Sequence, residues 1–182
     1  AIEITKNGQE AVKSLEQVKE SADLKDVDKT VNQAQSVIEE SGVASLEVAI
    51  KQVQNQPGSN TSVVSADQAQ VKEVISQVIN RESEKIDKIG AKADQVGVTE
   101  AHNADNSAKE IKDLTKELTG VTANSEKAKV ILDEAKDSLA QDNLSEALDK
   151  VKQSTQITKQ STAVVSKIED ISLGKMLNNL VA

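Results

Sequence analysis

Apolar residues recur every three or four positions along almost the whole chain of 182 residues. This spacing places them on one side of an α-helix, and no alternating pattern of strand type extends over a useful length. The sequence therefore predicts an all-α fold. The pattern divides the chain into seven helices, at residues 8–21, 25–41, 45–55, 66–96, 100–119, 123–140 and 145–172.

The apolar side of a predicted helix is made by the residues that its spacing places together. In 25–41 the side chains expected to face inward are Val27, Val31, Ala34, Val37 and Ile38. In 145–172 they are Leu148, Val151, Ile157, Val164, Val165, Ile168 and Ile171. The middle of this last helix is weak, because hydroxyls gather there on Ser154, Thr155, Thr158, Ser161 and Thr162.

Glycine marks the predicted boundaries between helices. Gly-Val-Thr occurs at 97–99 and at 120–122, and Ser-Gly-Val-Ala-Ser at 41–45 is similar. Glycine takes the left-handed conformation that ends many helices, and a following Thr or Ser can cap the next one. These stretches lack the further glycines and the lysine of phosphate-binding loops, so we interpret them as interhelical corners. The stretch 140–148 is a fourth turn, with Asp142 and Asn143 in it and Ser145 as cap.

The longest predicted connection lies at residues 55–62, which hold the only proline together with Gly, Ser and Asn. A Ser-x-x-Gln capping box at Ser65 and Gln68 then predicts a helix start. We divide the chain into a three-helix segment at 1–55, a loop at 56–64 and a helical bundle with an apolar tail at 65–182, with one continuous domain as the alternative. Because short corners make neighbouring helices antiparallel, the predicted fold is an elongated antiparallel bundle of about seven helices joined by short glycine-containing turns.

The composition changes the expected core and excludes several partners. Phe, Tyr and Trp are absent, so a core must be built from Leu, Ile, Val and Ala, which suits helix–helix seams. The net charge of -8 repels nucleic-acid phosphates, and no aromatic ring is present to stack on bases. No stretch reaches the roughly 20 apolar residues that span a bilayer. We therefore expect no nucleic-acid partner and no membrane span.

Residues for catalysis or metal binding are scarce. His102 is the only histidine and Cys is absent, so no second imidazole or thiolate can share a metal. A catalytic dyad with His102 would need a carboxylate such as Asp94, Glu100 or Asp105. Spacing alone does not assign any of the three as its partner. The glycine and the final glutamate of a calcium loop are missing from the acidic cluster Asp23, Asp26 and Asp28. The sequence predicts no catalytic, cofactor-binding or metal-binding residue, and hence a protein that is not an enzyme.

Both ends of the chain are apolar and are predicted to take part in self-association. The N-terminal isoleucines lie on a predicted extended arm, and the C-terminal cluster surrounds Gly174. The predicted self-association residues are Ile2, Ile4, Leu173, Met176, Leu177, Leu180 and Val181. The two ends either dock on the chain's own bundle or are donated to a neighbouring subunit, and the sequence leaves both arrangements open.

An extracellular or cell-surface location is expected. The chain begins at Ala1 without a basic or a long apolar segment, as a mature chain does after signal-peptide removal at a small residue. An excised segment is the alternative. Two Asn-x-Ser/Thr acceptor patterns, at Asn60 and Asn143, lie in predicted loops, and whether either asparagine is glycosylated stays open.

Residues 81–160 carry a resemblance, above all in EKIDKIGAKADQVGVTEAHNADNSAKEIKDL and EKAKVILDEAKDSLAQDNLSEALDKVKQ. This part resembles the alanine-rich helical hairpins of secreted or surface proteins of unknown function in bacteria and archaea. The second stretch is also similar to a tetratricopeptide hairpin in its Ala and Leu placement, without the aromatic residues or the period of that repeat. The resemblance implies a cell-envelope or extracellular setting and no catalytic residues.

These observations favour a structural protein that is secreted or surface-exposed and self-associates into an oligomer, filament or layer. The alternative is a protein–protein interaction module that accepts a partner helix in an interhelical groove, through anchors at i, i+3, i+4 and i+7. A lipid carrier is disfavoured, because the interfacial aromatic residues are missing.

Overall fold

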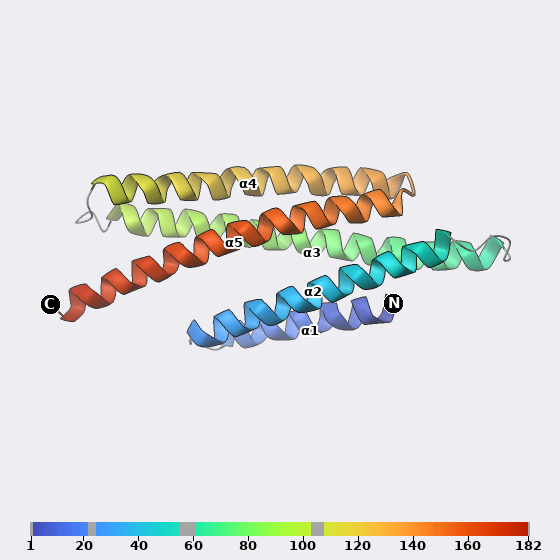
Figure 1. Cartoon of the computed structure of the whole chain (residues 1–182), viewed down its shortest axis with the longest axis horizontal. Coiled ribbons are helices and arrows are strands. Elements are labelled where there is room, and N and C mark those ends of the chain that lie inside the picture. The colour runs from blue at the N-terminus through green and yellow to red at the C-terminus, as the bar shows by residue number, and fades with distance from the viewer. Residues whose placement is uncertain (1, 22–24, 55–60, 103–107, 182) are drawn as a thin grey trace. The chain divides into compact units, whose positions relative to one another are not determined.

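The computed structural model describes residues 2–21, 25–54, 61–102 and 108–181, and within them the side chains of 2–17, 30–54 except Asn32, 67–97 and 113–171 except Leu114. Every described residue is helical apart from the turn at 141–143, so the all-α fold is confirmed. The helices are α1 (Ile2–Ser21), α2 (Lys25–Gln54), α3 (Thr61–His102), α4 (Ala108–Ala140) and α5 (Leu144–Val181), as Figure 1 shows. The described part thus holds five helices, and this number replaces the predicted count of about seven.

Three predicted corners lie inside helices, and this interpretation of the glycines is wrong. Gly42 lies within α2, Gly97 within α3 and Gly120 within α4. A glycine inside a helix costs about 1 kcal/mol relative to alanine, and the packing of a long apolar side offsets such a cost. Thr122 caps no new helix either. Its hydroxyl donates to the carbonyl oxygen of Leu118 one turn earlier in α4, at an Oγ1–O distance of 3.4 Å.

The other predicted boundaries are partly corrected. α2 ends at Gln54 and α3 begins at Thr61, so the predicted connection at 55–62 falls mostly on residues 55–60, which lie outside the described ones. α3 begins four residues before Ser65, so Ser65 does not cap it. α1 begins at Ile2, and the two N-terminal isoleucines therefore lie on a helix and not on an extended arm.

The turn between α4 and α5 is confirmed, and its geometry follows from its residues. Asp142 has a φ of 61°, the left-handed conformation that asparagine and aspartate tolerate better than most residues. The amide of Asn143 donates to the carbonyl of Ser138 at 2.9 Å, and the amide of Asp142 to that of Leu139 at 3.2 Å, which is the Schellman pattern of a helix end. The carbonyl of Asn143 then accepts from the amide of Ala147, so Asn143, and not Ser145, is the N-cap of α5.

The chain divides into two compact units, and unit 1 comprises Ala1–Val78 and Lys136–Asp149. In it α1 packs along α2 in the opposite direction (Figure 1), since Thr5 bonds Gly42 and Gly8 lies against Ile38. Val12 and Val31 are buried on these two helices. The rest of the unit has an aliphatic core, made by Leu46, Ala49, Ile50, Val71, Val74, Ile75, Leu139, Leu144, Ala147 and Leu148.

Unit 2 comprises Ile79–Ala135 and Lys150–Ala182. Its α4 and α5 segments run in opposite directions, because Glu134 pairs with Lys150 and Glu117 with Lys167. One apolar cluster of this unit consists of Ile89, Ala93, Leu118, Val121, Val165 and Ile168, with Val96 and Val164 packed against it. The division of the chain into 1–55, 56–64 and 65–182 stays a prediction.

Candidate functional site

The predicted self-association residues fall into two groups. Ile4 is 58% exposed on α1, and Ile2 at the start of the same helix is partly buried. The backbone of α5 continues to Val181, but the C-terminal side chains lie outside those that the structure describes: Leu173, Met176, Leu177, Leu180 and Val181. The structure thus presents Ile4 to solvent, and the role of the C-terminal group stays a prediction.

A second exposed apolar surface lies on α2, where the sequence did not predict one. Val37 is 63% exposed and Val48 is 51% exposed, although both are aliphatic. They are 11 residues apart, which is about three helical turns, so they point in nearly the same direction. Ser41 and Ala44 between them are exposed as well. We call Val37, Ser41, Ala44 and Val48 the α2 stripe.

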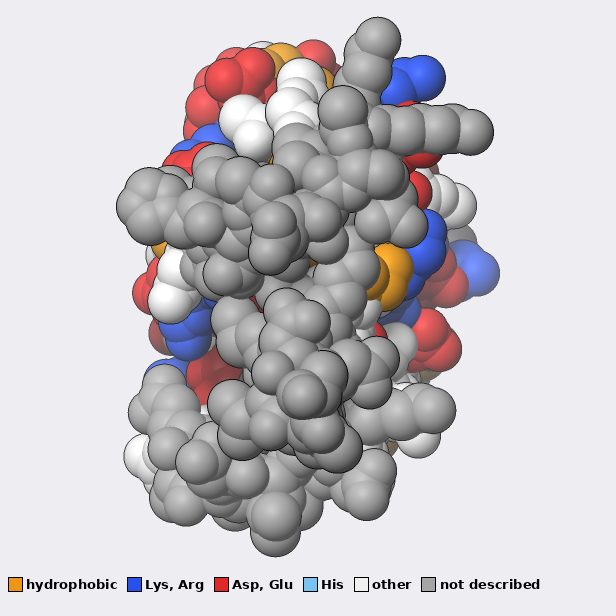
Figure 2. All heavy atoms as spheres, turned by 90° about the vertical axis from the view of Figure 1, so that its left-hand side faces the viewer, with side chains coloured by type: hydrophobic (Ala, Val, Ile, Leu, Met, Phe, Trp, Pro, Cys, Tyr) orange, Lys and Arg blue, Asp and Glu red, His pale blue; other side chains and the backbone are white. Residues whose placement is uncertain are grey.

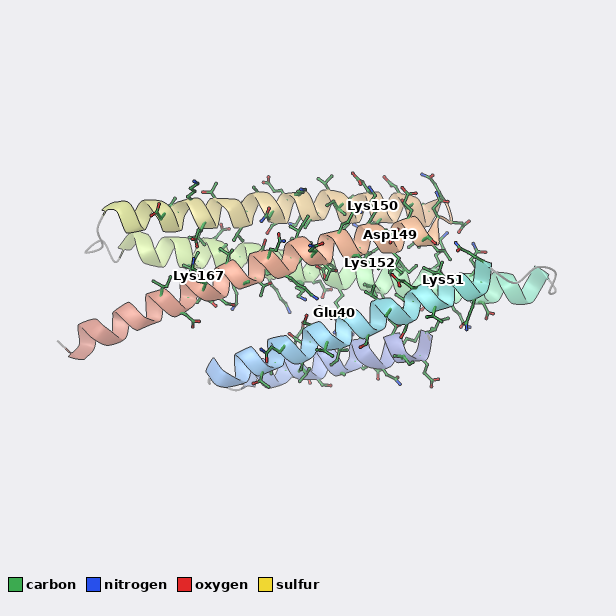
Figure 3. All side chains as sticks on the ribbon, in the orientation of Figure 1. Glu40, Lys51, Asp149, Lys150, Lys152 and Lys167 are labelled. Atoms are coloured by element: carbon green, nitrogen blue, oxygen red, sulfur yellow. The ribbon has the colours of Figure 1, made fainter. Side chains whose placement is uncertain are left out.

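The α2 stripe lies opposite the buried side of its helix. Leu46 is fully buried, and Val37 is nine residues from it, which is about 180° around the helix. Glu40 and Lys51 project from the same helix (Figure 3), and each follows a valine of the stripe by three residues. The stripe has the i, i+4, i+7, i+11 spacing with which an amphipathic helix meets another helix.

Val130 on α4 provides a comparison with the α2 stripe. It is also a valine and is 58% exposed. The neighbouring exposed side chains one turn away are Glu126, Lys127, Asp133 and Glu134, all of them charged. An isolated apolar side chain on a charged surface is ordinary, so Val130 marks no candidate site.

Unit 2 contains a buried row of hydroxyls, which is the second feature that stands out. Ser154, Thr158 and Ser161 of α5 are at most 2% exposed. Ser154 donates to the carbonyl oxygen of Ala128 in α4 at 3.2 Å, and Thr158 donates to the carbonyl of Ser154 in its own helix at 2.9 Å. Among the residues that the structure describes, the Oγ of Ser161 has no hydrogen-bond partner. A buried hydroxyl without a partner costs about 1–3 kcal/mol, a cost that an aliphatic side chain at this position would not carry.

Ion pairs stabilise the helix surface only slightly. Lys92 pairs with Glu169 at 3.3 Å and Lys129 with Asp87 at 2.5 Å, both within unit 2. Each of these four side chains is between about a third and 60% exposed, and exposed pairs contribute roughly 0–1 kcal/mol. On the face drawn in Figure 2, the coloured surface is mainly acidic and basic side chains with few apolar ones. Charged side chains of this kind form a solvated helix surface, which is ordinary for exposed helices.

Possible metal ligands do not come together in the part of the chain that the structure describes. No group of three or more His, Cys, Asp or Glu residues that could hold a metal ion occurs there. Asp94 is exposed on α3. The side chains of the other chemically interesting residues lie outside the described ones: Asp23, Asp26, Asp28, Glu100, His102 and Asp105. The expectation that these residues carry no chemistry stays a prediction.

Known protein families, curated proteins and solved structures give no match to this chain. The function must therefore be argued from the surface and the core. Among the described helices, none is both long and apolar enough to cross a membrane. The resemblance to envelope proteins suggested by residues 81–160 stays a prediction.

The sequence pattern misplaced several residues of the two candidate features. Val37 was expected to face inward and is exposed, and Ile171 was expected inward and is 37% exposed. Ile157 was assigned to the inward side of α5, but it is only partly buried, whereas its hydroxyl neighbours Ser154 and Thr158 are buried. The signal that could have placed them is the helical spacing itself. Ser154 and Thr158 follow Val151 at intervals of three and four residues and so lie on the same side of α5.

Proposed function

We propose that this chain is a non-enzymatic structural protein that associates with further copies of itself through the α2 stripe. The observation that carries the proposal is the pair Val37 and Val48, both more than half exposed on one side of one helix. Aligned apolar side chains on a helix surface gain stability when another helix covers them. Ile4 on α1 of the same unit is also exposed, and it offers a further apolar side chain for a second copy to cover.

The size of the stripe sets the kind of association. Eleven residues of helix extend about 16 Å. A stripe of this length buries only part of the roughly 1,200 Å² or more that the interface of a stable dimer buries. One stripe contact is therefore weak, and stable assembly needs a second contact on each chain. The apolar C-terminal residues from Leu173 to Val181 are the second contact that we propose, so that chains assemble into an oligomer, filament or layer.

Light scattering over a concentration series tests this proposal. The double variant Val37→Glu, Val48→Glu places two charges in the stripe. We expect its average mass to be lower than that of the wild-type protein and closer to the mass of one chain. Val130→Glu is the matched control, because it changes an equally exposed valine outside the stripe. A wild-type protein that stays a single chain at every concentration contradicts the proposal.

A partner protein is the second candidate function, and the same spacing of the stripe favours it. A partner helix with its own apolar side would cover Val37, Ala44 and Val48. A wild-type chain that is monomeric but captures one defined protein, with the capture lost in the stripe variant and kept in Val130→Glu, would select this function over self-association.

The location and the complete arrangement of the chain are also part of the proposal. An extracellular or cell-surface setting is supported by the resemblance of residues 81–160 to envelope proteins. The elongated antiparallel arrangement of all the helices is supported by the opposite directions of α1 and α2 and of α4 and α5.

A further inference from the structure

The buried side of α5 in unit 2 follows one regular spacing. Six residues at intervals of three and four are at most 3% exposed, namely Val151, Ser154, Thr158, Ser161, Val165 and Ile168. Such a spacing is that of a heptad seam, in which each position packs against a neighbouring helix. The outer positions are aliphatic and the three central ones carry hydroxyls. The centre of the seam therefore differs from its two ends.

The contacts of the hydroxyls set the centre of the seam apart from its ends. Only Ser154 bonds a different helix, through the carbonyl oxygen of Ala128. Thr158 bonds its own helix, and this bond survives when α5 moves away from α4. Ser161 has no partner for its Oγ among the described residues in the packed state, although water would satisfy it once the seam opens. At the C-terminal end, in contrast, Val165 and Ile168 belong to the apolar cluster.

We propose that residues 154–161 form a built-in opening point, at which α5 separates from α4 while the apolar cluster around Ile168 stays packed. Local opening in folded proteins takes place where few apolar contacts must be broken. The three hydroxyls reduce those contacts over two turns of helix. The opening is a property of unit 2 and does not depend on the proposed self-association.

Close packing is the competing explanation for the small side chains. Ser154 lies against Ala128, which is fully buried, and two small residues allow two helices to approach closely. A close contact of this kind would make the centre of the seam at least as stable as its ends. The two explanations therefore predict opposite orders of local stability along α5.

Hydrogen–deuterium exchange on the full chain separates them. We expect the backbone amides of 154–161 to exchange at least about tenfold faster than those of 165–168 in the wild-type protein. In the double variant Thr158→Val, Ser161→Ala, which keeps the Ser154 bond, exchange of 154–161 slows about tenfold, because Ser161→Ala removes the hydroxyl without a partner and Thr158→Val replaces a buried hydroxyl by an apolar methyl group. Exchange of 165–168 stays the same. If the double variant packs poorly, Ser161→Ala alone is measured instead, and we expect it to give part of this slowing.

Thr119→Val is the matched control. Thr119 makes the same bond to the carbonyl one turn earlier, at 2.8 Å to Thr115, but it is exposed on α4. Its replacement leaves exchange in α5 unchanged. The proposal is overturned if 154–161 exchange as slowly as 165–168 in the wild-type protein, or if both α5 variants exchange as fast as the wild type.

Discussion

The hydroxyl of Thr5 in α1 donates a hydrogen bond to the main-chain carbonyl of Gly42 in α2, at an Oγ1–O distance of 3.0 Å. Thr5 is 3% exposed, and a Cβ added at Gly42 would lie 3.5 Å from the Cγ2 of Thr5. The main chain at Gly42 therefore makes a contact between two helices, and the glycine ends neither of them. The same contact fixes the register of α1 on α2.

Loss of this hydrogen bond should weaken the packing of α1. Thr5→Val keeps the shape of the side chain and removes the donor, so we expect the free energy of unfolding to fall by about 1 kcal/mol. Urea unfolding followed by circular dichroism measures this change. Thr119→Val is the control, since its hydroxyl bond is exposed, and it should change stability by less than about 0.5 kcal/mol. Equal effects of the two substitutions would show that the buried Thr5 bond stabilises the protein no more than an exposed bond does.

Alanine at Gly120 should stabilise the protein, by about 0.5–1 kcal/mol. Gly120 is exposed inside α4 and a Cβ there would meet nothing within 4 Å, while alanine favours the helix. At Gly8 a Cβ would lie 3.0 Å from the Cγ2 of Ile38, so Gly8→Ala should destabilise by about 1 kcal/mol. Thermal unfolding of the two variants checks both signs. A clear loss of stability in Gly120→Ala would restore the interhelical corner that the sequence suggested.

The turn between α4 and α5 should depend on the backbone of Asp142 more than on its charge. Asp142 has a φ of 61° and pairs with Lys72 at 2.7 Å, in a pair whose two side chains are 37% and 59% exposed. Asp142→Ala should cost about 1 kcal/mol, because alanine is disfavoured in the left-handed region. Lys72→Ala breaks the same ion pair and should cost less than about 0.5 kcal/mol. Similar losses in urea unfolding for both variants would assign the effect to the ion pair instead.

The helical class could be predicted from the sequence because the apolar spacing is regular over long stretches. In α3 the predicted inward residues Val71, Ile75 and Ile86 are all at most 1% exposed. The error lay in treating glycine as a stop signal. Leu118 and Val121 are both buried on either side of Gly120, three residues apart, so the apolar side crosses the glycine without a change of phase. Tertiary packing outweighed the local preference of glycine there.

The candidate surface was predictable only in part. Ile4 was selected from its apolar terminal position and is exposed. Val37 was expected to face inward because of its spacing from Val31 and Ala34. Leu46, Ala49 and Ile50 set the buried side of α2, however, and Val37 lies opposite Leu46. The hydroxyls of α5 form a weak middle of the apolar side that is visible in the sequence, but their burial follows only from the positions of α3 and α4 within unit 2.

Cysteine cross-linking at the α2 stripe tests the proposed self-association most directly. The chain has no cysteine, so Ala44→Cys introduces a single thiol at an exposed position within the stripe. A disulfide forms only when two Cα atoms come within about 7 Å, so the cross-link reports where two copies touch. We predict that mild oxidation yields a covalent dimer of Ala44→Cys and leaves Val130→Cys a single chain. A single chain for Ala44→Cys, or equal cross-linking of both variants, would contradict association through the α2 stripe.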